Sequence, residues 1–179
     1  MSTILITSFA PWKAYQRSNA SDDLLASLQQ RQELPDNAIL MRQVPVNFHL
    51  APCHIIAKLV ELRPAVVVCC GMAEKRQRLS LELNGCCEEK VLKTALNLSD
   101  LMAGTRLTEI SHCAGTYVCN HLYFKVLEFI QQTRCSTQAL FIHVPPLNLL
   151  NQEFIAADFT LILRRLSLAA ATSPLQQVA

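Results

Sequence analysis

The chain has 179 residues, of which 51% are hydrophobic and 17% are charged, and its formal net charge at pH 7 is only +2. This size and composition are typical of one globular domain with its own core, so we expect residues 1–179 to form a single domain. The balanced charge, without a basic block, gives no support for nucleic-acid binding, and no apolar run reaches the ~18 residues that a membrane-spanning helix requires.

In the first half of the chain, short apolar runs alternate with helical patterns. Residues 3–9 are predicted to form a first strand. Residues 1–7 lack the basic region, long apolar core and cleavage site of a signal peptide. A helix capped by a serine or asparagine, a strand, a helix and a further strand are then predicted over residues 18–31, 38–46, 50–62 and 65–70. The last of these segments is β-branched and apolar, as a central parallel strand should be.

The second half of the chain is less regular. Residues 78–83 alternate and predict a strand, whereas residues 84–102 predict only a loop with a short helix. A helix, a strand and a long final helix are predicted over residues 116–132, 138–144 and 151–170, and residues 174–179 are expected to be a flexible tail. The alternation of strands and helices predicts a three-layer α/β/α domain.

Eight cysteines are many for this length, but their positions do not fit a disulfide scaffold. Cys69 and Cys70 lie inside an apolar strand-like run, and no Cys-x-x-Cys motif is present. His49, Cys53 and His54 come nearest to a metal cluster, but a helix start with scattered polar residues explains them equally well. We therefore expect no metal, and reduced thiols in the cytoplasm.

Residues 113–120, Cys-Ala-Gly-Thr-Tyr-Val-Cys-Asn, form the most informative segment. If Thr116 is the N-cap of the following helix, Cys119 is its third residue. Backbone N–H groups there lack partners, the helix dipole favours a thiolate, and one N–H group could serve an oxyanion hole. The alternative for such a cysteine is a small buried hydrophobic side chain.

His143 and Glu82 supply the further groups that a cysteine nucleophile needs. His143 ends an apolar run at the carboxyl end of a predicted strand, where ligands bind in open α/β sheets, and imidazole is the simplest general base near neutral pH. Glu82 lies in an alternating apolar segment and could orient the imidazole. The alternatives are a structural histidine at a strand end and a water-facing carboxylate on an edge strand.

Two aromatic residues, Phe9 and Trp12, flank Pro11 in the loop after the first predicted strand. Exposed at the ligand edge of the sheet, they would suit an apolar pocket for a flat ring, although aromatic residues at such positions can also belong to the core.

Taken together, these segments resemble the pyroglutamyl peptidase family, family C15 of the cysteine peptidases. Ala-Gly-Thr-Tyr-Val-Cys-Asn resembles the nucleophile motif of this family, and Phe-Ile-His-Val-Pro resembles its histidine motif. Further similarity is found in residues 4–12, residues 19–21 and residues 71–76, the last continuing to Glu82.

The resemblance implies a twisted, mixed and mostly parallel sheet between helices. It also implies an enzyme that removes an N-terminal pyroglutamyl (5-oxoproline) residue from small peptides whose N-terminus is blocked, without metal or organic cofactor. Cys119 would be the nucleophile that forms a thioester, His143 the base and Glu82 the group that orients His143. Phe9 and Trp12 would sandwich the lactam ring, and Asn19 would order their loop.

The chain departs from the family pattern at several positions. Met72 stands where the family has a glutamine expected to recognise the pyroglutamyl group, and a thioether cannot donate a hydrogen bond. Ser8, Lys13-Ala14 and Glu74-Lys75 replace family glycines, so their loops are expected to change shape.

Residues 84–109 replace a longer family segment that contributes to the pocket wall and to subunit contacts, which leaves open whether the chain forms a homo-oligomer. Two alternatives therefore stand beside a pyroglutamyl peptidase. The same three residues could act on another small acyl or amide substrate, or the protein could be a non-catalytic binding protein on this fold.

Overall fold

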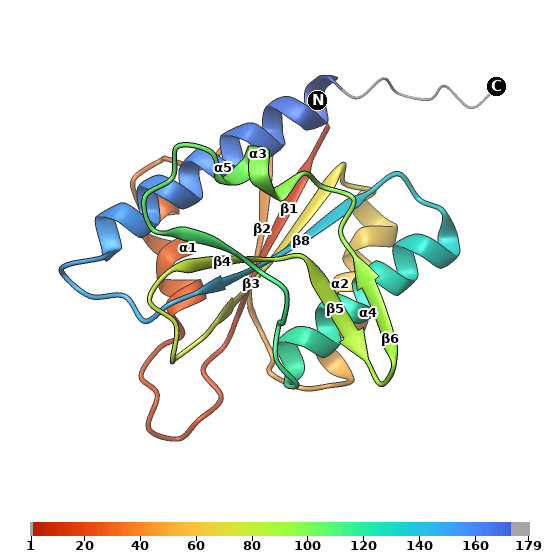
Figure 1. Ribbon diagram of the computed structural model, residues 1–179, viewed down its shortest axis with the longest axis horizontal. Helices are drawn as coiled ribbons and strands as arrows, with labels where there is room; N and C mark the ends of the chain where they lie inside the picture. Colours follow the sequence, from red (N-terminus) through yellow and green to blue (C-terminus); the bar gives the residue numbers. More distant parts are fainter. Residues whose placement is uncertain (1, 173–179) are drawn as a thin grey trace.

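A six-stranded sheet separates two layers of helices in the computed structural model, which describes residues 2–172 (Figure 1). The strand order is β2-β1-β3-β8-β4-β7, and every neighbouring pair is parallel except β8 and β4. The strands are β1 (Ile4–Phe9), β2 (Ala38–Val44), β3 (Val66–Met72), β4 (Leu79–Glu82), β7 (Thr108–Ser111) and β8 (Gln138–Val144). The predicted three-layer architecture with a mixed, mostly parallel sheet is confirmed.

The two faces of the sheet carry separate cores. On one face lie α1 (Ala20–Gln30), α3 (Leu98–Met102) and α5 (Gln152–Thr172), and on the other lie α2 (Leu50–Leu62) and α4 (Val118–Thr133) (Figure 1). Strand β8 contributes to both cores, because successive side chains of a strand point to opposite faces. Leu140 and Ile142 pack toward α1 and α5, whereas Ala139 and Phe141 pack toward α2 and α4.

Helix boundaries follow local signals that the sequence displays. Asn19 caps α1, since its side chain accepts a hydrogen bond from the backbone N–H of Ser21. Helix α2 ends at Leu62, because Arg63 adopts a left-handed conformation (φ 44°) and Pro64 follows it. The predicted bounds of this helix and of strand β8 match the structure residue for residue.

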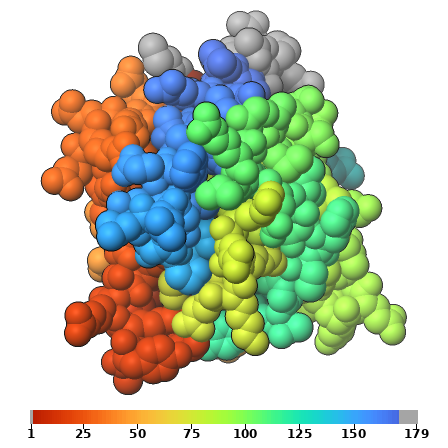
Figure 2. Space-filling model, turned by 60° about the vertical axis from the view of Figure 1, so that its left-hand side comes forward, coloured from red at the N-terminus to blue at the C-terminus, as the bar shows by residue number. Residues whose placement is uncertain are grey.

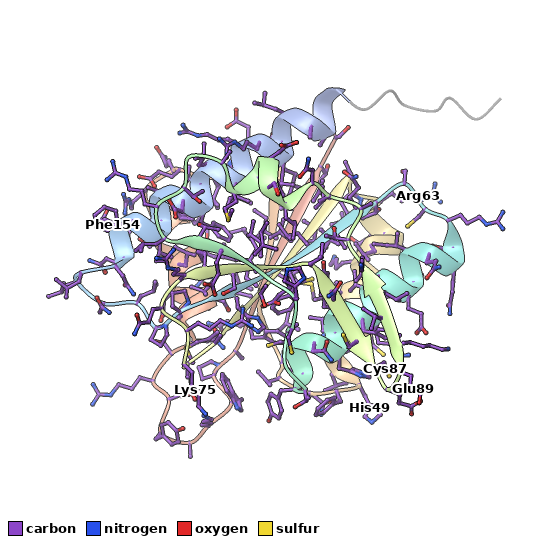
Figure 3. The ribbon with its side chains drawn as sticks, viewed as in Figure 1. His49, Arg63, Lys75, Cys87, Glu89 and Phe154 are labelled. Atoms are coloured by element: carbon purple, nitrogen blue, oxygen red, sulfur yellow. The ribbon has the colours of Figure 1, made fainter. Side chains whose placement is uncertain are left out.

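Three strands were not predicted. Residues 84–93 form a hairpin of β5 (Asn84–Cys87) and β6 (Lys90–Lys93), which lies against α4 as a separate two-stranded sheet. Cys87 and Glu89 at its turn are labelled in Figure 3. Strand β7 is the third, and it covers the outer side of β4. Glu82 therefore lies on an interior strand, and the alternative of a water-facing edge carboxylate is wrong.

Within residues 2–172, no helix is long and apolar enough to cross a membrane. The predicted tail at residues 174–179 lies outside the described residues.

Candidate active site

The carboxyl ends of β1, β3 and β8 and the first turn of α4 meet at the lower end of the molecule in Figure 1. A cavity of about 180 Å³ opens there. Six of the residues predicted from the sequence line it, namely Phe9, Trp12, Asn19, Met72, Cys119 and His143. The seventh, Glu82, lies behind His143 and is fully buried.

Cys119 is carried by the first turn of α4. The N-cap is Tyr117 rather than the predicted Thr116, so Cys119 is the second helical residue and not the third. Tyr117 makes no capping hydrogen bond through its side chain, as expected because a tyrosine hydroxyl cannot reach back as a serine or threonine hydroxyl does.

The Sγ of Cys119 lies against Gly71 of β3. A Cβ atom added to Gly71 would be only 2.8 Å from this sulfur, so only glycine leaves room for the thiol. Gly71 pairs in register with His143 on the neighbouring parallel strand β8. Because paired residues of a sheet project to the same face, the thiol and the imidazole lie on the same side of the sheet.

Burial opposes ionisation of the thiol. Cys119 is partly exposed to the cavity, but the protein around the sulfur raises its pKa to about 12. The hydrogen bond from its own backbone N–H at the helix start lowers the pKa, whereas the nearby charge of Glu82 raises it. The helix start therefore favours the thiolate, as expected from the sequence, but desolvation is the larger effect and the net pKa of the thiol is raised.

His143 is held by a short hydrogen bond to Glu82. Nδ1 of His143 lies 2.6 Å from Oε1 of Glu82, and both side chains are buried. Burial raises the pKa of Glu82, but the hydrogen bond from His143, the charge that His143 carries when it is protonated and the charge of Arg76 outweigh it, so the net pKa is lowered. An ionised carboxylate has no proton to donate, so Nδ1 of His143 is the donor and Nε2 is left free to accept a proton.

Arg76 links the buried carboxylate to the loop before α4. Nη1 of Arg76 donates to Oε1 of Glu82 at 2.6 Å, and Nη2 donates to the carbonyl oxygen of Cys113 at 2.9 Å. One guanidinium therefore fixes Glu82 and the segment that leads to Cys119. Arg76 belongs to the family-like segment at residues 71–76, but no role was predicted for it.

The apolar wall of the cavity is formed mainly by aromatic side chains. Tyr117 lies between Trp12 and Phe48, with ring centroids 6.4 Å and 5.8 Å away. Phe9 reaches the cavity from the end of β1 but is only 3% exposed, so the expectation that it would be an exposed loop residue was wrong. Sequence reasoning also missed four lining residues, Val46, Glu74, Ala114 and Tyr117. Glu74, Ala114 and Tyr117 lie in the family-like segments, and this position in the sequence is the signal that could have identified them.

Met72 and Ser8, which stand where the family has a glutamine and a glycine, each form a hydrogen bond within this chain. The sulfur of Met72 accepts a hydrogen bond from the backbone N–H of Ala20 at 3.4 Å. The hydroxyl of Ser8 donates to buried Asp22 at 2.6 Å, and Ser8 does not belong to the cavity lining. Asn19 joins the loop to α1, since its Nδ2 donates to the carbonyl oxygen of Ala10 at 3.3 Å.

Among residues 2–172, no group of three or more His, Cys, Asp and Glu side chains is arranged to hold a metal ion. His49, the first member of the weak cluster considered from the sequence, lies at the lower edge of the molecule (Figure 3) and is exposed.

Comparison with protein families identifies one matching family. The sequence model described as "Pyroglutamyl peptidase" matches residues 2–86 and 97–160. The unmatched segment between them contains most of the β5–β6 hairpin and the chain that follows it.

Individual proteins of known name are similar over most of their length. "Pyrrolidone-carboxylate peptidase 2" of Caldanaerobacter subterraneus subsp. tengcongensis is 27% identical, and the match covers 83% of this chain and 84% of that protein. "Pyrrolidone-carboxylate peptidase" of Brevibacillus brevis is 25% identical, over 81% of this chain and 79% of that protein.

Solved structures share the fold at lower sequence identity. Pyroglutamyl peptidase I of Bacillus amyloliquefaciens superposes with a TM-score of 0.80 at 18% identity, over 96% of this chain and 98% of that chain. Pyrrolidone carboxyl peptidase from Thermococcus litoralis superposes with a TM-score of 0.74 at 21% identity, over 100% of both chains.

Proposed function

Because this chain belongs to the pyroglutamyl peptidase family and is therefore a cysteine-type peptidase, we propose that it removes an N-terminal pyroglutamyl residue from peptides through Cys119, His143 and Glu82. The observation that carries the assignment of residues is the cavity lined by both Cys119 and His143, with His143 bonded to the ionised Glu82 behind it. This is the order of nucleophile, base and orienting acid that acyl transfer requires.

The raised pKa of Cys119 favours a neutral thiol at rest over a thiolate. Nε2 of His143 then takes the thiol proton as the sulfur attacks the carbonyl carbon between the 5-oxoproline ring and the next residue. Backbone N–H groups in the first turn of α4 have no acceptor within the helix and are suited to hold the oxyanion. His143 next protonates the leaving amine, which leaves a thioester on Cys119.

Hydrolysis of the thioester would follow the same path in reverse. His143 removes a proton from water, the resulting hydroxide attacks the thioester, and 5-oxoproline leaves as the thiol is re-formed. Glu82 stays ionised throughout and stabilises the imidazolium, while Arg76 keeps Glu82 in position. Phe9 and Trp12 would provide the apolar wall for the lactam ring, with Asn19 holding the loop that connects them.

The direct test is hydrolysis of a fluorogenic pyroglutamyl amide by the purified, reduced protein. We expect turnover by the natural chain and a loss of at least about a thousandfold in Cys119→Ala, because the nucleophile is removed. Cys53→Ala, which removes an exposed thiol, is the matched control and should keep full activity. Equal activity of Cys119→Ala and the natural chain would exclude the proposed nucleophile.

A second candidate, the same three residues acting on another small acyl or amide group, is favoured by one observation. Met72 lines the cavity, its sulfur is occupied by the N–H of Ala20, and a thioether offers no proton to a lactam oxygen. We expect Met72→Gln to raise kcat/KM for the pyroglutamyl amide by about tenfold if the cavity still takes a lactam ring. A fall in kcat/KM, together with faster turnover of a cyclopentanecarbonyl amide by the natural chain, would favour the second candidate.

A further inference from the structure

Two loops that are far apart in the sequence are joined beside the cavity, which Trp12 of one loop and Glu74 of the other both line. Nζ of Lys13, between β1 and α1, lies 2.5 Å from Oε2 of Glu74, between β3 and β4. The side-chain amide of Gln16 donates to the other carboxylate oxygen, Oε1, at 2.7 Å. Both oxygens of Glu74 are therefore bonded to the first loop. We call these three residues the Lys13–Gln16–Glu74 bridge.

The bridge reaches the backbone of Trp12 directly. Oε1 of Gln16 accepts hydrogen bonds from the backbone N–H groups of Trp12 at 3.2 Å and Lys13 at 3.3 Å. The same carboxamide therefore holds Glu74 with its nitrogen and the Trp12 backbone with its oxygen. The ammonium group of Lys13 also lies 5.2 Å from the centroid of the Trp12 ring, within the range of a cation–π interaction.

The loop and its bridge form one side of the cavity. Trp12 and Glu74 both line it, whereas Cys119 and His143, which also line it, belong to other elements, α4 and β8. Figure 2 shows the segment after β1 (red) beside the segment between β3 and β4 (yellow), and Lys75, next to Glu74, is labelled at this end of the molecule in Figure 3. A shift of the bridge would therefore move the Trp12 wall while leaving the reacting groups in place.

The strength of the bridge depends on solution conditions. Side chains of Lys13 and Glu74 are about one-third exposed, at 32% and 37%. The hydrogen bond from Lys13 lowers the pKa of Glu74, so both groups are charged at neutral pH. Ion pairs at this exposure are weak and are screened by salt.

We propose that the Lys13–Gln16–Glu74 bridge positions Trp12 as the outer wall of the cavity, and that Lys13 and Glu74 thereby determine how tightly the substrate ring is held. The proposal rests on the proposed function, which makes this cavity the substrate site. Lys13 and Glu74 act as positioning residues, because they reach the ring only through Trp12. Their loss is expected to weaken binding rather than slow the bond-breaking step.

Trp12 is the only tryptophan of the chain, so its fluorescence reports on the wall without any need for activity. Lys13→Met and Glu74→Gln should each shift the emission to the red and increase quenching by acrylamide. Raising NaCl from about 0.05 M to about 1 M should do the same to the natural chain and have little effect on either variant. The charge swap Lys13→Glu/Glu74→Lys restores the ion pair but removes the acceptor of the Gln16 amide nitrogen, so it should recover only part of the natural emission. Lys58→Met, which breaks the exposed Lys58–Glu61 pair on α2, is the control and should change nothing.

Kinetics with the fluorogenic pyroglutamyl amide then separate binding from chemistry. KM should rise about three- to fivefold in Lys13→Met and Glu74→Gln, as an exposed ion pair allows, with the loss appearing in KM rather than in kcat. Unchanged Trp12 emission in both variants would overturn the proposal whatever the activity, and so would a fall in kcat at constant KM. If emission responds as expected but the natural chain does not turn over the amide, the bridge stands and the proposed function fails.

Discussion

Neighbouring groups shift the pKa of the Cys119 thiol in opposite directions. The helix start lowers the thiol pKa, whereas burial and the charge of Glu82 raise it to about 12. A thiol in this environment reacts mainly when a base removes its proton during attack, which is the role proposed for His143. The charge of the resting pair is therefore a measurable property of this site.

We expect alkylation of Cys119 by iodoacetamide to accelerate about tenfold for each pH unit between pH 7 and pH 10, without a plateau in that range. The thiolate fraction grows in this proportion as long as the pH stays below the thiol pKa. Mass spectrometry of the labelled peptides measures the rate, with exposed Cys53 as a reference in the same sample. A rate already constant below pH 7 would instead indicate a thiolate–imidazolium pair.

Much of the site could be predicted at the residue scale, because its motifs are short and local. Cys119, His143 and Glu82 were each chosen from a few neighbouring residues, and the fold brings Glu82 and His143 into contact. The role of Arg76 was not predicted, since its two partners, Glu82 and the carbonyl oxygen of Cys113, come together only in the folded chain. Burial of the Cys119 thiol could not be predicted from the sequence either, because it depends on how β3 packs against α4.

At the scale of elements, the β5–β6 hairpin fixes the helix that carries Cys119. Asn120, next to Cys119, donates to the carbonyl oxygen of Cys86 at 2.7 Å and accepts from its N–H at 2.8 Å. Gly85 lies so close to α4 that an added Cβ would be 2.7 Å from the backbone nitrogen of Phe124. Backbone atoms of a helix cannot move aside as a side chain can, so the contact tolerates only glycine.

Gly85→Ala should therefore push the hairpin away from α4. We expect it to lower the free energy of unfolding by about 1–3 kcal/mol, the range for overpacking, and to reduce kcat because the turn that carries Cys119 shifts. Urea unfolding and turnover of the pyroglutamyl amide measure the two effects. Glu89→Ala, at the exposed turn of the same hairpin, is the control. Natural stability and kcat in Gly85→Ala would show that the hairpin does not support the helix.

This hairpin could not be predicted from its sequence. Two-residue hairpin loops usually contain Asn-Gly, Asp-Gly or a similar glycine pair, whereas the loop here is Glu88-Glu89, with Glu88 at φ 52°. Its strands are also too short and too mixed in polarity to show an alternating pattern. Long apolar segments such as β3 and β8 were predicted well, because burial on both faces leaves a continuous hydrophobic run.

At the scale of the whole molecule, the central strands bury ionisable groups that play no part in the proposed chemistry. Adjacent residues Cys69 and Cys70 of β3 point to opposite faces of the sheet, one into each core, and both are at most 1% exposed. Desolvation raises the pKa of Cys69 to about 12 and raises that of Cys70 well above its usual value of 9.0. The stability of both cores is therefore linked to alkaline pH.

In the unfolded chain both thiols ionise above about pH 9, whereas in the folded chain the pKa of Cys69 is raised to about 12 and that of Cys70 is raised well above 9.0. The folded state then binds more protons than the unfolded state, so stability is fully present below pH 9 and falls as the pH rises. Each thiol contributes about 1.4 kcal/mol for each pH unit in this window. The pair should make the chain about 3 kcal/mol less stable at pH 10 than at pH 8.

Urea unfolding under reducing conditions at several pH values between 8 and 10 measures this slope. Cys69→Ala and Cys70→Ala each leave a cavity and should lower stability at every pH, but each should also remove about half of the slope that the two thiols cause. Cys53→Ala, which removes an exposed thiol, should leave the slope unchanged. If both buried variants keep the natural slope, alkaline destabilisation arises from other groups, and the two thiols do not link the cores to pH.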